Sequence, residues 1–182
     1  MSFYDASVLF PAQVRDTLMW MAFTGLVQAK WTDEIHNEWM RNLLKRKPHL
    51  KRKDIEWTRD QMNKAVPDCL VEGYEGLIPS LTLPDPDDRH VLAAAIRSGA
   101  QTIVTENLKH FPTKELAKYG ITAERADTFV LGLIDINPGA VATVLRKQWQ
   151  NLKDPPFTRE EFLHNLEHAG LVQTVAAIRP YL

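Results

Sequence analysis

The chain has 182 residues, and its 22 basic and 23 acidic side chains give a net charge of −1 and a pI near 6.6. This length suits one α/β domain with an appendage and is short for two independent hydrophobic cores. Because the charges nearly balance, the surface as a whole is not basic, and any attraction to phosphate must come from a local patch. Cys69 is the only cysteine, which excludes an internal disulfide and a cysteine zinc cluster.

The sequence also carries no signal for a membrane. No apolar run approaches the ~20 residues that a spanning helix needs. The first residues lack the charged and apolar regions of a signal peptide. With the single cysteine, these features predict a soluble cytoplasmic protein without a membrane partner.

Short apolar runs alternate with helical patterns over the first 125 residues. The candidate strands are residues 2–4, 26–30, 69–71 and 102–105, of which 69–71 has the weakest pattern. Helices are expected between these runs, each bounded by a capping residue, a glycine or a proline: Pro11 to near Gly25, Thr32 to before Pro48, about 53–66, and Asp85 to Gly99. The alternation predicts an α/β fold with a central, mainly parallel sheet flanked by helices.

The helix that begins near Asp85 has a well-specified start. Asp85 suits the N-cap, Pro86 suits the first helical position, and the acids that follow favour the positive end of the helix dipole. Asp88 begins the stripe that continues through Val91 and Leu92, with Ala95 and Ile96 one turn later. A carboxylate directed toward the core needs a counter-charge, a hydrogen-bond network or a metal.

The rest of the chain reads as a helical extension. Residues 127–136 predict a packed helix, although the apolar pattern alone leaves open a strand that begins near Phe129. From about Ala140 the tail is helical again, and Thr158 with Glu161 forms a capping box. We therefore expect these helices to follow the sheet-containing part of the chain.

Four side chains are placed by this pattern near one edge of the sheet. In an open parallel sheet the functional crevice lies beyond the carboxyl ends of the strands. Asp5 follows the first strand and Asn107 follows the strand at 102–105, whereas Asp88 begins the helix that leads into that strand. Glu38 lies at the margin of the apolar stripe of its helix, from which it can turn toward the sheet.

The acids among these residues define a chemistry. Asp5, Glu38 and Asp88 would supply an oxygen-only cluster, which suits Mg²⁺ or Mn²⁺ rather than zinc. One or two such ions would orient a water and neutralise charge on a phosphodiester, so no covalent protein nucleophile is required. Without metal, crowded carboxylates repel one another and raise their pKa values.

The same segments resemble a known family. Asp88 with its small-residue helix, Gly99, a hydrophobic strand and Thr105-Glu106-Asn107 is similar to the second half of a PIN domain. That family contains metal-dependent ribonucleases, including VapC-type toxins of toxin–antitoxin pairs. The resemblance covers roughly residues 2–130 and rests on the order and spacing of short motifs.

The resemblance implies a three-layer PIN-like fold, with a nuclease domain over residues 1–137 and a helical extension over 138–182. It implies that Asp5, Glu38 and Asp88 bind metal, with Asp87 as the alternative if the register slips by one. Asn107 stands where many members have a fourth acid, so the site has one charge less, which weakens the case for a second ion. The implied active site is Asp5, Glu38, Asp88 and Asn107.

Simpler interpretations exist for individual features. Asp5 and Asn107 fit turn or cap positions, Glu38 fits a solvated helix face, and His90 fits a packing or capping role better than that of a catalytic base. The basic run at 45–53 is either a solvated helix end or a phosphate track. The helical tail is open to three roles: packing, a homodimer contact, or a platform for an antitoxin.

These features give one leading hypothesis and two rivals. The leading hypothesis is a Mg²⁺- or Mn²⁺-dependent endoribonuclease that hydrolyses RNA phosphodiester bonds, as the toxin of a toxin–antitoxin pair. The first rival is a catalytically weakened PIN-like protein that binds RNA or a partner. The second is a phosphohydrolase for small substrates, which the absence of an Asp-x-Asp pattern and of a glycine-rich phosphate loop disfavours.

Overall fold

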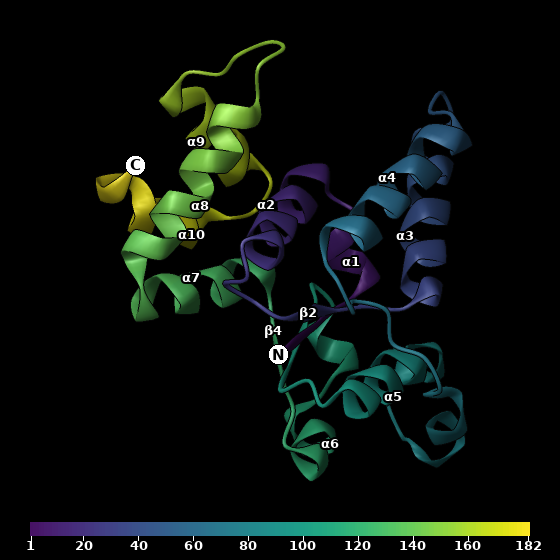
Figure 1. Ribbon diagram of the computed structural model, residues 1–182. Coiled ribbons are helices and arrows are strands. Elements are labelled where there is room, and N and C mark those ends of the chain that lie inside the picture. The colour runs from purple at the N-terminus through teal and green to yellow at the C-terminus, as the bar shows by residue number, and fades with distance from the viewer. The chain divides into compact units, whose positions relative to one another are not determined.

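The computed structural model describes residues 1–182, which form two compact units that interleave in sequence (Figure 1). The first unit comprises Met1–Phe10 and Gln28–Arg125, and the second comprises Pro11–Val27 and Ala126–Leu182. The boundary near residue 137 that the sequence suggests stays a prediction. No helix combines the length and the apolar character that crossing a membrane requires.

The first unit contains the sheet. Its strands are β1 (Ser2–Tyr4), β2 (Ala29–Lys30), β3 (Thr102–Val104) and β4 (Thr122–Glu124). Its α-helices are α1 (Ala6–Leu9), α3 (Asp33–Arg46), α4 (Arg52–Ala65), α5 (Arg89–Ser98) and α6 (Thr113–Leu116). Its 3₁₀ turns are η1 (Glu75–Ser80), η2 (Pro86–Asp88), η3 (Leu108–His110) and η4 (Ala117–Tyr119). The second unit is helical: α2 (Ala12–Phe23), α7 (Ala126–Ile136), α8 (Pro138–Asn151), α9 (Arg159–His168), α10 (Val172–Ile178) and η5 (Arg179–Tyr181).

All strand pairs are parallel, in the order β2-β1-β3-β4. The predicted α/β fold with a parallel sheet, flanking helices and a C-terminal group of helices is therefore confirmed. Three details differ from the sequence pattern. The strand expected at 26–30 is limited to Ala29–Lys30, the run at 69–71 forms one bridge between Trp31 and Leu70, and β4 had no clear sequence signal.

The register of β1 and β3 sets the position of the site. Phe3 pairs with Ile103 and Tyr4 pairs with Val104, so both strands end at the same level. The backbone of Asp5 continues the ladder by donating to Val104 O at 3.0 Å. Asp5 and Thr105 therefore follow neighbouring strands at the carboxyl edge of the sheet, where a functional crevice is expected.

Large apolar side chains fix the helices of the first unit on this sheet. Phe3, Tyr4, Trp31, Trp39 and Ile103 are fully buried. The helix α3 begins as its sequence predicts, because the Thr32 side chain accepts a hydrogen bond from the Ile35 backbone. Burial of Ile35 and Trp39 then fixes which face of α3 points inward, and Glu38 lies at the margin of that face.

The second unit packs five α-helices together. The helix α2 contacts α8 and α9, and α7 contacts α8 and α10. The predicted capping box of Thr158 and Glu161 is present at the start of α9. The stretch 127–136 is the helix α7 rather than a strand.

Candidate functional site

Asp5 is a buried carboxylate with an uneven hydrogen-bond environment. Asp5 is only 3% exposed to solvent. Oδ2 accepts from the Ser7 hydroxyl at 2.6 Å and from the Thr105 hydroxyl at 2.8 Å. Oδ2 also caps α1 through the Ser7 backbone N–H, whereas Oδ1 has no protein donor. The protein therefore orients this carboxylate through Oδ2 alone.

Glu38 is held by a histidine from the neighbouring helix α5. Its Oε1 lies 2.8 Å from His90 Nε2. The His90 side chain is 12% exposed, and its other ring nitrogen, Nδ1, is buried without a partner. An Nε2 proton donated to the carboxylate satisfies this contact and fixes the direction in which Glu38 points.

The charge state of His90 reflects several opposing effects. Burial of the ring is the largest effect and lowers the pKa, because it disfavours the charged form. The hydrogen bond to Glu38 raises the pKa. The negative charges of Glu38, Glu34 and Asp5 act in the same direction as that bond. Their sum raises the pKa of His90 above its usual value. Asp5 is therefore close enough to the Glu38–His90 pair to influence it electrostatically.

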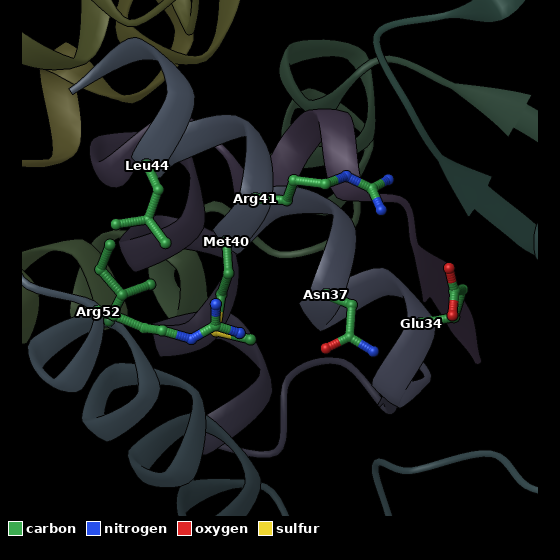
Figure 2. A pocket seen from close by; sticks show the side chains of 7 residues that line it. Glu34, Asn37, Met40, Arg41, Leu44 and Arg52 are labelled. Atoms are coloured by element: carbon green, nitrogen blue, oxygen red, sulfur yellow. The ribbon is translucent and has the colours of Figure 1, made fainter. Parts of the chain in front are cut away.

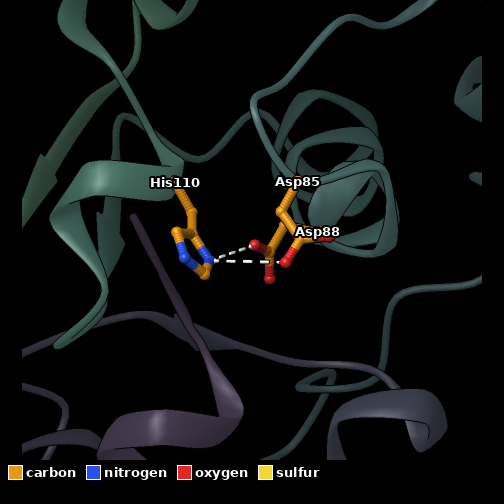
Figure 3. A group of neighbouring side chains, drawn as sticks. All are labelled: Asp85, Asp88 and His110. Carbon is orange, nitrogen blue, oxygen red and sulfur yellow. Dashed lines mark hydrogen bonds and ion pairs between the residues drawn. The ribbon is translucent and has the colours of Figure 1, made fainter.

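Asp88 belongs to a second cluster, which joins two segments of the chain (Figure 3). His110 Nδ1 at the end of η3 lies 2.6 Å from Asp88 Oδ2 and 3.8 Å from Asp85 Oδ2. One ligand atom from each of these three side chains lies within 4.8 Å of the others. Figure 3 shows the imidazole facing both carboxylates.

Asp88 also responds to Asp5. Partial burial is the main cause of a raised pKa for the Asp88 carboxyl, and the hydrogen bond and charge of His110 oppose that rise. The negative charges of Asp5 and Asp85 add to it. Burial and the two neighbouring acids therefore both favour the protonated form of the Asp88 carboxyl.

Of the predicted residues, only Asp88 belongs to the cluster of donor atoms within 4.8 Å, which it forms with Asp85 and His110. Asp5 is linked electrostatically to Asp88, and to Glu38 through His90. Asn107 is exposed, and its backbone N–H donates to the Thr105 hydroxyl at 3.0 Å. Its side chain makes no hydrogen bond, so a role for the amide stays a prediction.

The donor set of this region fits a divalent cation. Carboxylates from β1, α3 and the start of α5 supply oxygen donors of the kind that Mg²⁺ and Mn²⁺ accept. Asp5 accepts all of its side-chain hydrogen bonds at Oδ2, which leaves Oδ1 without a protein donor. The donor atoms that lie within 4.8 Å of one another belong to Asp85, Asp88 and His110, and a metal-binding role for Asp5 and Glu38 stays a prediction.

Sequence reasoning missed two side chains of the cluster. The sequence predicts Asp85 only as a helix cap, and its side chain does cap the helix by accepting from Asp87 N at 3.0 Å. The sequence pattern assigns no role to His110, although it follows Asn107 by three residues, one turn of a 3₁₀ helix. That spacing, next to a candidate site residue, is the signal that could have identified it.

A pocket of about 430 Å³ lies between α3 and α4, close in sequence to Glu38 (Figure 2). Its lining combines two guanidinium groups, two other polar side chains and an apolar floor: Glu34, Asn37, Met40, Arg41, Leu44, Arg52 and Ile55. Figure 2 shows Glu34 and Asn37 toward one end and Leu44 and Arg52 toward the other. Arg52 is paired with Glu56 at 2.8 Å, whereas Arg41 makes no ion pair.

Two protein-family models match this chain. The family described as "PIN domain" matches residues 4–109, which include Asp5, Glu38, Asp88 and Asn107. The chain belongs to the PIN domain family. The family described as "VapC50 C-terminal domain" matches residues 126–180, within the helical second unit. The resemblance to VapC-type PIN domains is thereby confirmed.

One curated relative supports the same grouping. The PIN protein is 43% identical over 94 residues to "Putative ribonuclease VapC50" of Mycobacterium tuberculosis (strain ATCC 25618 / H37Rv). This match covers 52% of the chain and 55% of the relative, so it spans little more than half the length of either. No solved structure matches the chain.

Proposed function

We propose that this PIN domain is a metal-dependent endoribonuclease that hydrolyses RNA phosphodiester bonds, with Asp5, Glu38, Asp88 and Asn107 in its active site. The observation that carries the proposal is the Asp5 carboxylate, which is buried at the carboxyl edge of the sheet and is held through Oδ2 alone. The negative charges of Asp5 and Asp85 also act on Asp88, and carboxylates that repel one another favour a bound cation.

Each acid has a partner that orients it. Ser7 and Thr105 hold one oxygen of Asp5, which leaves the other free to bind. His90 holds Glu38, and His110 holds Asp88. Such partners fix the direction of metal-binding side chains and are expected to matter for affinity.

Asp5, Glu38 and Asp88 would hold Mg²⁺ or Mn²⁺. When bound, such an ion polarises the phosphodiester and lowers the pKa of a water. The protein itself would position the RNA and keep the carboxylates ionised and aligned. Asn107, exposed at the start of η3, offers an amide that can hydrogen-bond a water or a phosphate oxygen.

The pocket between α3 and α4 offers a surface for RNA on the helix that carries Glu38. Arg41 lines it without an ion-pair partner, which leaves its guanidinium available to a phosphate. The chain as a whole has a net charge of −1, so the attraction has to be local. We propose that Arg41 contacts the RNA backbone.

We further propose that the protein is the toxin of a toxin–antitoxin pair and acts in the cytoplasm. The proposal is supported by the match to the VapC50 C-terminal domain and by the sequence identity to a relative that is named as a ribonuclease. A cognate antitoxin as partner, a homodimer, and the division into a nuclease domain at 1–137 and an extension at 138–182 are predictions of the same proposal.

The decisive experiment is RNA cleavage by the purified chain with Mg²⁺ or Mn²⁺, with EDTA as the blank. Asp5→Asn keeps the shape of the side chain and removes its charge. We expect cleavage to fall by about 100-fold or more, since loss of a ligand costs at least as much as loss of an outer partner.

Asp87→Asn is the matched control, because Asp87 is an exposed neighbour of Asp88 outside the cluster. It is expected to cleave at the wild-type rate. Full metal-dependent cleavage by Asp5→Asn would refute the site. No cleavage by the wild type with either ion would refute the nuclease and favour the rival in which the domain binds RNA or a partner.

A further inference from the structure

Residues 45–53, which we call the basic turn, concentrate positive charge on a chain that is slightly acidic as a whole. They contain six of the 22 Lys and Arg side chains and no acid, whereas the whole chain has a net charge of −1. Lys45 and Arg46 end α3, Arg52 and Lys53 begin α4, and the other residues connect the two helices. Figure 1 shows α3 and α4 side by side, so the basic turn lies at one end of this pair.

The cations of the basic turn are exposed and mostly unpaired. Arg52 pairs with Glu56 at 2.8 Å, and the guanidinium carbon of Arg46 lies 5.0 Å from the centre of the Phe10 ring. The four lysines make no ion pair and no side-chain hydrogen bond: Lys45, Lys47, Lys51 and Lys53. Most of this charge is therefore available to an anionic partner.

Helix stability explains only part of this charge. The cations in the last turn of α3 complement its dipole, but Lys51, Arg52 and Lys53 lie at the start of α4, where the dipole favours acids. Lys51 is the N-cap and makes no side-chain capping bond, and Asp54 is the one acid of the first turn. Like charges at this density also repel one another. A bound polyanion would neutralise them and remove this repulsion.

An exposed aromatic ring lies beside these cations. Trp57 is 63% exposed, and it is the one exposed tryptophan among the five of the chain. It follows Lys53 by four residues on α4, so the two side chains lie on the same face of the helix. An aromatic ring next to cations is the arrangement on which an unpaired base stacks while its phosphates contact the charges.

We infer that the basic turn and Trp57 form a binding surface for single-stranded RNA, in which the cations contact phosphates and Trp57 stacks on a base. Arg52 belongs to the basic turn and also lines the pocket that holds Arg41, so the two surfaces are continuous. This inference rests on the proposed function, because that function supplies RNA as the substrate. It adds that the bound stretch is unpaired, since the bases of a duplex are stacked on one another and hide their faces.

The phosphate contacts are tested by binding of the full chain to a uridine strand of about 12 nucleotides, in EDTA so that binding is measured without cleavage. Lys45→Gln, Lys47→Gln and Lys51→Gln are combined in one variant. The slope of log Kd against log salt concentration should fall by about 2, because each phosphate contact on a single strand contributes about 0.7.

A matched variant removes the same charge from three exposed lysines outside the basic turn: Lys114→Gln, Lys147→Gln and Lys153→Gln. It should keep the wild-type slope. If the two triple variants have equal slopes, the binding reports net charge and the inference is wrong.

Trp57→Ala tests the stacking. We expect its Kd for the uridine strand to rise by about tenfold and its Kd for an RNA duplex to stay at the wild-type value. Trp57→Phe keeps an aromatic ring and should retain most of the affinity. Phe23→Ala removes a comparably exposed ring, 59% exposed, from α2 and is expected to bind both RNAs as the wild type does. An unchanged Kd for the single strand in Trp57→Ala, or equal losses for single strand and duplex, overturns the assignment.

This inference and the proposed function fail in different ways. A wild type that binds the uridine strand through the basic turn but cleaves no RNA with either ion refutes the nuclease and leaves this surface standing. A wild type that cleaves RNA, with KM unchanged in the variant of the basic turn and in Trp57→Ala, refutes the surface and leaves the nuclease standing. A wild type that binds no single-stranded RNA also refutes the surface and leaves an acidic protein segment as the alternative partner of the basic turn.

Discussion

The hydroxyl of Thr105 joins the ends of the two central strands through one oxygen atom. It donates to Asp5 Oδ2 at 2.8 Å and accepts from the Asn107 backbone at 3.0 Å. Thr105 is fully buried, so no water can replace these bonds without a rearrangement. The orientation of Asp5 therefore depends on a side chain that does not itself reach substrate.

Thr105→Val tests this dependence, since valine keeps the shape and removes the hydroxyl. We expect RNA cleavage to fall by about 10- to 100-fold, together with Mn²⁺ affinity, because an outer partner of a ligand is lost. Thr102→Val on the same strand is the matched control and should retain the wild-type rate. Wild-type cleavage and metal affinity in Thr105→Val would show that Ser7 alone orients Asp5.

A second buried residue, His36, has surroundings that favour the neutral imidazole. Its Nδ1 accepts from the Trp39 indole at 3.0 Å, and its Nε2 lies 2.9 Å from the Asn63 side-chain oxygen. Protonation of Nδ1 would place its N–H against the N–H of the Trp39 indole, so that two donors would face each other. Burial is the main cause of a lowered pKa for His36.

Because the folded pKa lies below the unfolded value of about 6.5, the unfolded chain binds a proton first as the pH falls. The contribution of His36 to stability is therefore present above about pH 6.5 and is lost below it, with a slope of at most about 1.4 kcal/mol per pH unit. Urea unfolding between pH 5 and 7.5 should show a smaller pH dependence for His36→Gln than for the wild type. Equal slopes would contradict this assignment.

The three candidate acids could be selected from the sequence because each occupies a marked position, and their shared role stays a prediction. Asp5 follows a strand, Glu38 lies at the edge of an apolar stripe, and Asp88 starts a helix. The spacing of His110 from Asn107 places it near a candidate site residue, but its contact with Asp88 could not be predicted from that spacing. It depends on the path of the chain after β3, which only the assembled sheet defines.

At the scale of elements, the helix α3 packs into the core with one face and lines the pocket with another. Its buried face carries Ile35 and Trp39, and its exposed face carries Arg41 along the pocket shared with α4. The sequence predicts this helix well, because capping, charge order and apolar spacing all agree. It does not predict the pocket, which requires the packing of α4 against α3.

Arg41→Gln tests whether the pocket binds RNA. We expect KM to rise with little change in kcat, and the slope of log KM against log salt concentration to fall by about 1, as for the loss of one phosphate contact. Lys64→Gln removes the same charge from α4 at an exposed position that does not line the pocket. If both variants change KM and its salt dependence equally, the effect is general charge and not a contact in the pocket.

The shortest elements show the limit of sequence reasoning. The strand β4 consists of Thr122, Ala123 and Glu124, which offer no apolar alternation. Its extended conformation is fixed by backbone pairing with β3, in which Val104 pairs with Glu124. Such a strand is set by its partner rather than by its own side chains.

At the scale of the molecule, the helix α2 belongs with the C-terminal helices although it lies between the first two strands in sequence. It contacts α8 and α9, and its Thr17 side chain bonds to the buried Gln148 of α8 at 3.3 Å. The apolar stripe of α2 predicts which face is buried. It does not reveal the partner, because amphipathicity carries no information about what covers it.

Removal of residues 126–182 tests this arrangement. The fragment 1–125 keeps α2 but loses α8 and α9, so its apolar face becomes exposed. We expect the fragment to bind a hydrophobic dye and to unfold without a cooperative transition, and coexpression with residues 126–182 to reverse both effects. A fragment 1–125 that is monomeric and unfolds cooperatively would show that α2 does not need these helices.

The pairing of α2 with α8 also constrains the timing of folding during translation. Thr17 and Gln148 are 131 residues apart in the chain. At 5–20 residues per second, the ribosome takes roughly 7 to 26 s to make that interval. During this interval α2 lacks α8, its packing partner. Prematurely terminated chains would therefore expose the apolar face of α2 to chaperones and proteases.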